Sequence, residues 1–588
     1  MSVKTSADQE TTGFVRAASL EELKGKDILV VHVEGHTVAL FYHQDRVFAV
    51  DNRCPHMGFP LDRGSVHDCI LTCHWHHARF DLETGGTFDQ FAGDVRSFPT
   101  KVVGDEVYID VRPKGDYAEQ MRGRLRLGLE RNLTLVVGKS VIGMLSAGVD
   151  PAVPFRAGLD FGATYRRTGW GMGMTMHTCL FNLLPTLDEN DRAHALYHGL
   201  SAVTRELSGD APRFVIEPLP DATTDVATLK RWFRQFVEVR DSEGAERCIV
   251  TAIRSGGDDR QMADMLFAAA TDHRYINIGH VADFTNKAFE ALDHIGWEHA
   301  ERILTTLPRG FAFADRMEES NAWRHPIDLV SMLEAAFEVL PETVESAEAK
   351  PGRWPERDAL VETILADDPQ ASVDAMMDAL RSGCDPVELA SIVTYCAARR
   401  IAHFHKSNDF NDWDTALHTF TFAHAIEQGL RRSPSVETLR GVFDAATSVY
   451  LDRFLNVPSV PLPKSRADDP DAVLAEIPAM LDKQQQIAAV GKAVGSYLYG
   501  GGDPDRLIAL LGRMLLREDR DFHTIQTFEA AVRQFQLNRD APEGPHFLIA
   551  AARYLAAHAP TVRAQKQTFD IASRLHRGEN VFEDDEAG

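Results

Sequence analysis

Two short segments of the chain combine cysteine and histidine at spacings that suit metal binding. Cys54-Pro55-His56 is followed, after 16 residues, by Cys73-His74-Trp75-His76. Each segment offers one thiolate and one imidazole, and this donor set suits a centre in which one iron is held by sulfur and a second iron by nitrogen. Tetrahedral zinc is the alternative, but zinc fingers usually pair Cys with Cys and His with His.

The residues that flank both segments favour the iron centre. Met57-Gly58 follows the first segment, and the second continues as His77-Ala78-Arg79-Phe80-Asp81 with Thr84-Gly85-Gly86 behind it. With these flanks, residues 13–113 closely resemble the Rieske [2Fe–2S] family, of the ferredoxin and ring-hydroxylating-oxygenase type. The resemblance implies that Cys54 and Cys73 hold one iron, while His56 and His76 hold the other through ring nitrogens. We therefore expect a [2Fe–2S] cluster that relays single electrons.

Neighbouring positions indicate the potential of the predicted cluster. High-potential Rieske proteins carry a disulfide between the two loops, and Ser and Tyr hydroxyls that hydrogen-bond to the cluster. The matching positions here are Phe59, Trp75, Ala78 and Phe80. Because fewer donors reach the sulfurs, we expect a potential at the low end of the Rieske range, roughly −150 mV. The other Cys and His residues nearby fall off the ligand spacing and are interpreted as structural or surface residues: His67, Cys69, His74 and His77.

The elements that must position these residues are short strands. Apolar runs at 28–33, 38–41, 47–50 and 107–111 are separated by turn residues, which predicts a small all-β domain over 13–113. From about residue 119 the apolar residues recur at helical spacing, so 119–580 is predicted to be a large all-α domain. Residues 112–116 are interpreted as the linker, and 581–588 as a solvated acidic tail. The fold class is thus multidomain.

The predicted helical domain contains an internal repeat. Asp150-Pro151, Asp385-Pro386 and Asp503-Pro504 each follow a Gly within two residues and precede an apolar helix, and Asp258 takes the same place without Pro. The repeated unit is a helical hairpin. The alternative is that any helical array reuses Asp-Pro at helix starts.

One histidine follows each repeat start by 20 to 33 residues, mostly in the pattern H-x3-F: His177, His280, His418 and His523. Hairpins that each aim one His at a common axis could build a second, non-haem iron site. We expect two or three of these histidines to bind together with a carboxylate from Asp283, Glu290 or Asp414. The alternative is that all four pack between helices and are satisfied by neighbouring carbonyl groups.

Another histidine pair comes near a known iron-binding pattern. Rieske ring-hydroxylating oxygenases bind mononuclear iron with D-x-x-H-x4-H, and Asp191, His194 and His198 approach this pattern with the histidines one residue too close. This pair and His405 are reserve ligands. Residues 271–290 also resemble the questin-oxidase-like family of helical proteins, which are linked to aromatic polyketide oxidation, although no site residue is carried over from that resemblance. It favours a bulky hydrophobic substrate.

Composition limits the partners. The 588 residues contain 62 Lys and Arg against 87 Asp and Glu, and a net charge of -25 argues against nucleic acid. The chain shows neither a secretory signal nor a run of about 18 apolar residues, so we expect a cytoplasmic protein without a membrane partner. No flavin or nicotinamide motif is evident, so a separate reductase or ferredoxin is the expected electron donor.

We therefore predict a Rieske-type oxidoreductase whose cluster relays single electrons to a site in the helical domain. The predicted reaction is the oxidation or oxygenation of a small organic substrate, with catalytic residues left unassigned. The alternative is a non-catalytic electron-transfer protein whose helical repeats dock a partner enzyme. Iron beyond the two ions of the cluster would separate these classes.

Overall fold

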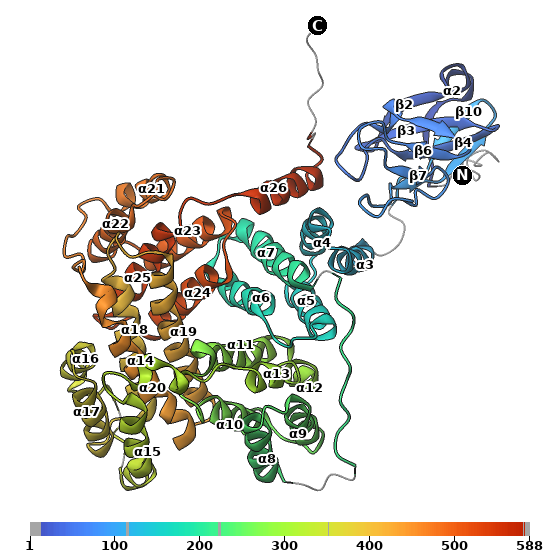
Figure 1. The fold of residues 1–588 in the computed structure, drawn as a ribbon. Helices are drawn as coiled ribbons and strands as arrows, with labels where there is room; N and C mark the ends of the chain where they lie inside the picture. The colour runs from blue at the N-terminus through green and yellow to red at the C-terminus, as the bar shows by residue number, and fades with distance from the viewer. Residues whose placement is uncertain are drawn as a thin grey trace, which may run out of the picture. The chain divides into compact units, whose positions relative to one another are not determined.

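The computed structural model describes residues 13–112, 117–207, 209–220, 225–347, 349–350, 352–579 and 581 (Figure 1). The predicted linker residues 113–116 and all but the first residue of the predicted acidic tail lie outside these ranges. The predicted fold class is confirmed, because a small β-sheet region precedes a large helical one.

The β region consists of three small antiparallel sheets. The predicted apolar runs each form a strand of these sheets, and the short helix α2 (Leu20–Lys26) follows the first strand. In order across each sheet, the strands are β1 (Val15–Ser19), β10 (Glu106–Ile109) and β9 (Thr100–Val103); β2 (Ile28–Val33), β3 (His36–His43), β4 (Arg46–Asp51) and β8 (Ser97–Phe98); and β5 (Ser65–His67), β6 (Ile70–Thr72) and β7 (Arg79–Asp81).

Strand β3 lies between two apolar cores because its side chains alternate between the faces of the sheet. Val38 and Leu40 enter one core, and Ala39 and Phe41 enter the other. The second core also contains Cys54 and Cys73. A buried sheet face therefore supports the two predicted ligand segments.

Aspartate caps start several of the helices that the repeat predicts. Asp258, Asp385 and Asp503 are the N-cap residues of α10 (Asp259–Ala270), α18 (Pro386–Ala402) and α23 (Pro504–Arg517), and each accepts backbone N–H bonds. Other helices of the region are α5 (Ala152–Tyr165), α7 (Glu189–Leu207), α8 (Val226–Glu238), α9 (Ser242–Arg254), α12 (Ala300–Leu304), α13 (Pro308–Ala312), α14 (Asn321–Arg324), α15 (Leu329–Ser346), α16 (Arg357–Leu365), α17 (Pro369–Arg381), α20 (Val436–Leu451), α21 (Pro470–Leu481), α22 (Ile487–Tyr499) and α25 (Gly544–Ala557).

Contacts divide the chain into two units at places other than the composition change near residue 119. The first unit joins residues 1–154 to 567–588, and the second spans 155–566. Helices α3 (Tyr117–Glu130) and α4 (Thr134–Ser146), with most of α26 (Ala564–His576), thus group with the β region. One reason is that Arg53 donates from Nη1 to the carbonyl of Leu575 over 2.9 Å, and from Nη2 to the carbonyl of Glu579.

Four helices of the second unit form a bundle. They are α6 (Met172–Leu183), α11 (His280–Ile295), α19 (Phe410–Arg432) and α24 (Phe522–Leu537). Both α6 and α19 pack against α11 and against α24, so α11 and α24 face each other across the bundle. Side chains from α11 and α24 therefore meet along its axis.

Candidate metal centres

The two Cys-His segments fold as similar loops. Cys54 donates its backbone N–H to Phe59 over 2.8 Å and accepts from Gly58 over 2.8 Å, and Cys73 makes the equivalent bonds with Ala78 and His77 over 2.8 and 3.0 Å. Gly58 and His77 hold the same left-handed place in the two turns, with φ of 86° and 60°. This repeated turn brings both cysteines and both following histidines to one site.

The side chains of these loops are close enough to share a cluster. The rings of His56 and His76 lie edge to face with centroids 4.8 Å apart, and both cysteines are buried and unpaired by disulfide. The hydrogen bond from Cys54 to Cys73 lowers the pKa of Cys73 to about 6, helped by the backbone N–H groups of Trp75 and His76, and it raises the pKa of Cys54. These donors favour the thiolate form that binds iron.

Three of the four predicted histidines converge in the helical unit. The Nε2 atom of His418 lies 3.1 Å from Nε2 of His280 and 3.1 Å from Nε2 of His523. Among the described residues, these three form the group whose ligand atoms all lie within 4.8 Å of one another, and it includes no carboxylate. We call it the His triad.

Asp414 orients two histidines of the triad, His418 and His523, from the side opposite to their Nε2 atoms. It lies one turn before His418 on α19, its carbonyl accepts a hydrogen bond from His418, and its carboxylate lies 3.6 Å from Nδ1 of His523. Tyr554 donates to the same carboxylate over 3.3 Å. Because Nδ1 of His418 is committed to the carbonyl of Asp414, its Nε2 presents a lone pair to the centre of the triad.

Two imidazoles of the triad are held in the neutral form that binds metal. Burial, together with the neighbouring imidazoles, lowers the pKa of His280 to about 4 and that of His418 to about 2. Two neutral rings whose Nε2 atoms lie 3.1 Å apart need a cation or a proton between them.

A strained turn positions the first triad residue. Tyr275, Asn277 and Ile278 have φ of 46°, 50° and 48°, a region that a β-branched residue rarely adopts. The next residue, Gly279, has φ of 93°, and a Cβ atom there would lie 2.7 Å from Cβ of Phe422. His280 then begins α11. Strain of this kind persists where the surrounding structure holds it, often at functional sites.

His177 is the one of the four candidate histidines that lies outside the triad. It points to the outer side of α6, where Gly158 and Gly199 pack against its ring and its Nε2 lies 2.9 Å from the carbonyl of Phe155. The alternative of a packing histidine satisfied by a carbonyl therefore describes this residue. Asp283 and Glu290 lie further along α11, outside the triad.

The reserve ligands also lie outside the triad. His194 and His198 are buried on α7 with ring centroids 5.0 Å apart, and His405 is 2.9 Å from the hydroxyl of Ser407. Within the described part of the chain, none of these three histidines belongs to a group of three possible metal ligands.

Comparison with known proteins identifies the first centre. Residues 13–99 match the sequence profile of the Rieske [2Fe-2S] domain. Over 102 residues the chain is 30% identical to the ferredoxin component of a naphthalene 1,2-dioxygenase system from Pseudomonas aeruginosa, covering 98% of that relative and 17% of this chain. The chain belongs to the Rieske [2Fe-2S] family.

Other relatives match the same Rieske domain. The ferredoxin component of an alkene monooxygenase system from Xanthobacter autotrophicus is 32% identical over 108 residues, which are 88% of that relative and 18% of this chain. A solved ferredoxin of carbazole 1,9a-dioxygenase from Nocardioides aromaticivorans is 30% identical, with a TM-score of 0.16 and coverage of 98% of that chain and 17% of this one. The Rieske domain implies a [2Fe–2S] cluster and electron transfer. No described helix is long and apolar enough to span a membrane.

A lysine beside the Rieske loops could not be predicted from the Cys-His motif, because it is distant from the motif in sequence. Lys139 on α4 donates from Nζ to the carbonyl of Pro55, between Cys54 and His56. Burial, and after it the positive charge of Arg124, lowers the pKa of Lys139 to about 7. Cys54 acts in the opposite direction and favours the charged form of the lysine. Its ammonium group is thus held next to the expected cluster.

Replacing Lys139 should lower the potential of the Rieske cluster. A unit charge removed from roughly 7–10 Å at an effective dielectric constant near 20 changes the energy by about 2 kcal/mol, and solvent screening leaves a fall of roughly 50 mV. We expect this fall for Lys139→Gln in an EPR-monitored redox titration at pH 6, where the lysine is protonated. Lys139→Arg keeps the charge and should keep the potential; equal falls in both variants would contradict an electrostatic role.

Proposed function

We propose that this protein is a Rieske-dependent oxidase or oxygenase. In this proposal Cys54, Cys73, His56 and His76 hold the [2Fe–2S] cluster, which passes single electrons to an iron bound by the His triad. The observation that carries the proposal is the convergence of three Nε2 atoms from three helices within 4.8 Å. An electron-transfer domain fused to such a donor set has an acceptor in its own chain.

The residues around the triad support this chemistry. Iron bound by three imidazoles supplies one-electron redox steps and leaves coordination positions open. Asp414 fixes the ring orientation of His418 and faces His523, which raises the basicity of these ligands. Phe284 and Phe522 pack beside His280, with ring centroids 5.2 and 5.6 Å from it, and form an apolar wall. A hydrophobic substrate would displace water from this wall.

The relatives suggest the substrate class and the partners. They serve systems named for naphthalene, alkene and carbazole oxidation, so we propose a small apolar organic substrate for this chain. Residues 271–290, which include His280 and resemble the questin-oxidase-like family, favour a bulky aromatic one. A separate reductase or ferredoxin would supply electrons, and the predicted cytoplasmic location belongs to the same proposal. The cluster must also come close to the triad, within one chain or across a subunit interface.

Metal analysis of two histidine variants tests the proposal. We expect three irons per wild-type chain, two in His418→Ala, and three in His177→Ala, because His177 is a buried histidine of the same bundle that lies outside the triad. Emission spectrometry would identify and count the metal. Two irons in wild-type protein would instead support the non-catalytic carrier, and zinc as the third metal would contradict the oxidase.

A further inference from the structure

The two facing helices of the bundle carry polar stripes that run away from the His triad. On α11, His280 is followed on the same face by Asp283, Lys287 and Glu290, and on α24, His523 is followed by Gln526 and Glu529. Asp283 is 2% exposed, Lys287 0%, Gln526 1% and Glu529 3%. Burying so many polar groups disfavours folding unless they are partnered. We call these five residues beyond the histidines the polar column.

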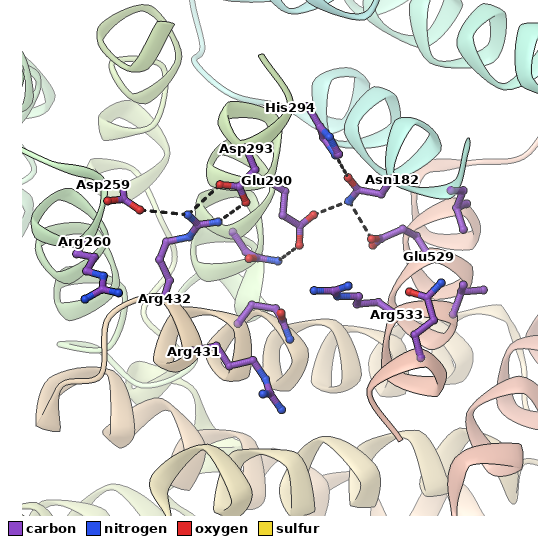
Figure 2. Close-up of a pocket in the computed structure, with 15 residues that line it drawn as sticks. Asn182, Asp259, Arg260, Glu290, Asp293, His294, Arg431, Arg432, Glu529 and Arg533 are labelled. Carbon is purple, nitrogen blue, oxygen red and sulfur yellow. Dashed lines mark hydrogen bonds and ion pairs between the residues drawn. The ribbon is translucent and has the colours of Figure 1, made fainter. Parts of the chain in front are cut away.

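The outer end of the column is an ion cluster beside a cavity (Figure 2). Lys287 donates to Glu290 over 2.8 Å and to Glu529 over 2.5 Å. Asn182 joins the same two carboxylates over 2.6 and 2.9 Å, as Figure 2 shows. The cavity, of about 490 Å³, is lined by Glu290, Glu529 and the exposed Arg533. Cavity water can therefore reach the carboxylates.

The inner end of the column contains buried polar atoms. Oδ2 of Asp283 and both amide atoms of Gln526 are buried and make no hydrogen bond of normal geometry within the described residues, and the Gln526 side chain is close enough to Asp283 to lower the pKa of that carboxyl. They lie one helical turn from His280 and His523, between the triad and Lys287. Buried polar atoms of this kind are usually satisfied by ordered water.

The charges around Asp283 keep it able to gain and lose a proton. Burial raises the pKa of Asp283 to about 7, while Lys287 and the side chain of Gln526 oppose that rise and Glu290 and Glu529 add to it. From α6, the Cys179 thiol also faces these groups, and burial raises its pKa well above the usual value.

We propose that the polar column conducts protons from the cavity to the His triad. Glu290 or Glu529 takes a proton from cavity water, Lys287 passes a proton to Asp283 and is reprotonated by the carboxylate, and Asp283 releases its proton toward the triad. This role of the polar column rests on the proposed function, in which the His triad binds iron and reacts with O2. Oxygenation of a substrate RH by one O2, with two electrons and two protons, gives ROH and one water; the external reductase supplies the two electrons through the cluster, and solvent supplies the two protons through the column.

Deuterium exchange at Asp283 tests the column without a metal at the triad. In the full chain at pH 6, the infrared C=O band that is lost in Asp283→Asn should shift within seconds of transfer into D2O. The double variant Lys287→Met/Glu529→Gln, which removes a charge together with its partner, should slow this shift at least about tenfold, because exchange then requires local opening. Asp452 is a matched reference: it is another buried carboxyl, its pKa is raised to about 7 mainly by burial, and it lies outside the column, so its band should exchange at the wild-type rate.

A second variant covers the case in which the double variant does not fold. Gln526→Leu has a similar volume and removes only the buried amide beside Asp283, and it should also slow exchange at Asp283. No Asp283 band, or wild-type exchange rates in Gln526→Leu and in a folded double variant, would overturn the column. Iron analysis of the same samples separates the two proposals: slow exchange in protein without a third iron supports conduction while contradicting the oxidase, and unchanged exchange in protein with three irons does the reverse.

Discussion

A Cys54→Ser/Cys73→Ser variant is expected to lose the whole [2Fe–2S] cluster and keep one iron per chain. A hydroxyl is a far poorer iron ligand than a thiolate, and both cysteines are buried beside backbone N–H donors that favour the charged sulfur. The protein should lose its brown colour, its labile sulfide and its Rieske EPR signal. Iron and sulfide assays on purified protein would measure this.

The matched control is Cys69→Ser in the same domain. Cys69 lies near the loops, and its Sγ is 3.6 Å from Oε1 of Gln44, outside the pair formed by Cys54 and Cys73. We expect this variant to keep cluster and colour. A brown double variant with labile sulfide would refute the ligand assignment, and a double variant without any iron would refute the separate site at the His triad.

Arg274→Ala is expected to destabilise the helical unit by about 3–5 kcal/mol, the range for breaking a buried ion pair. Arg274 is 7% exposed and donates over 2.7 Å to Asp444, which is fully buried, and over 2.6 Å to the carbonyl of Thr271. Its removal leaves the carboxylate of Asp444 buried without a counter-charge. Urea unfolding followed by circular dichroism would measure the loss.

The loss should depend on pH in a defined direction. Burial raises the pKa of Asp444 to about 6 even with Arg274 present. A carboxyl whose pKa is higher in the folded than in the unfolded state destabilises the fold as pH rises through the interval between the two values. Without Arg274 the folded value rises further, so the defect should be larger at pH 8 than at pH 5.

Arg440 offers a matched control for this prediction. Its guanidinium lies 5.9 Å from the ring of Phe337, whose ring Arg274 also contacts, at 4.7 Å, but its ion pair with Asp272 is long, at 4.0 Å, and partly exposed. Arg440→Ala should change the free energy of unfolding by less than about 1 kcal/mol. An equal loss in both variants would show that aromatic contact, rather than the buried ion pair, accounts for the effect.

The Rieske loops could be predicted from the sequence because all their determinants are local. Cys54, His56, Cys73 and His76 lie in two short segments, and each turn closes within six residues. The triad was harder to predict from the sequence, because His418 is 138 residues from His280 and 105 residues from His523. Only the repeat suggested that these histidines share an axis.

The same repeat could not tell which face of each helix points inward. His177 has the same spacing as its counterparts, yet glycines on α5 and α7 leave room for its ring on the outer side of α6. The polar column, by contrast, left a signal that the prediction used only in part, because Asp283 and Glu290 were considered only as metal ligands. Together with Lys287 they recur at helical spacing, the pattern of a polar stripe along one face of a helix.

The bond between Arg53 and Leu575 has a consequence for biosynthesis. Its two partners are 522 residues apart, and they belong to the same unit. Ribosomes add about 5–20 residues per second, so on the order of 30–100 s pass between the emergence of these residues. The Rieske loops of the nascent chain therefore lack their contact with helix α26 until that helix has been synthesised. Cluster insertion into the growing chain would meet loops that lack this support, whereas insertion after release would meet the finished unit.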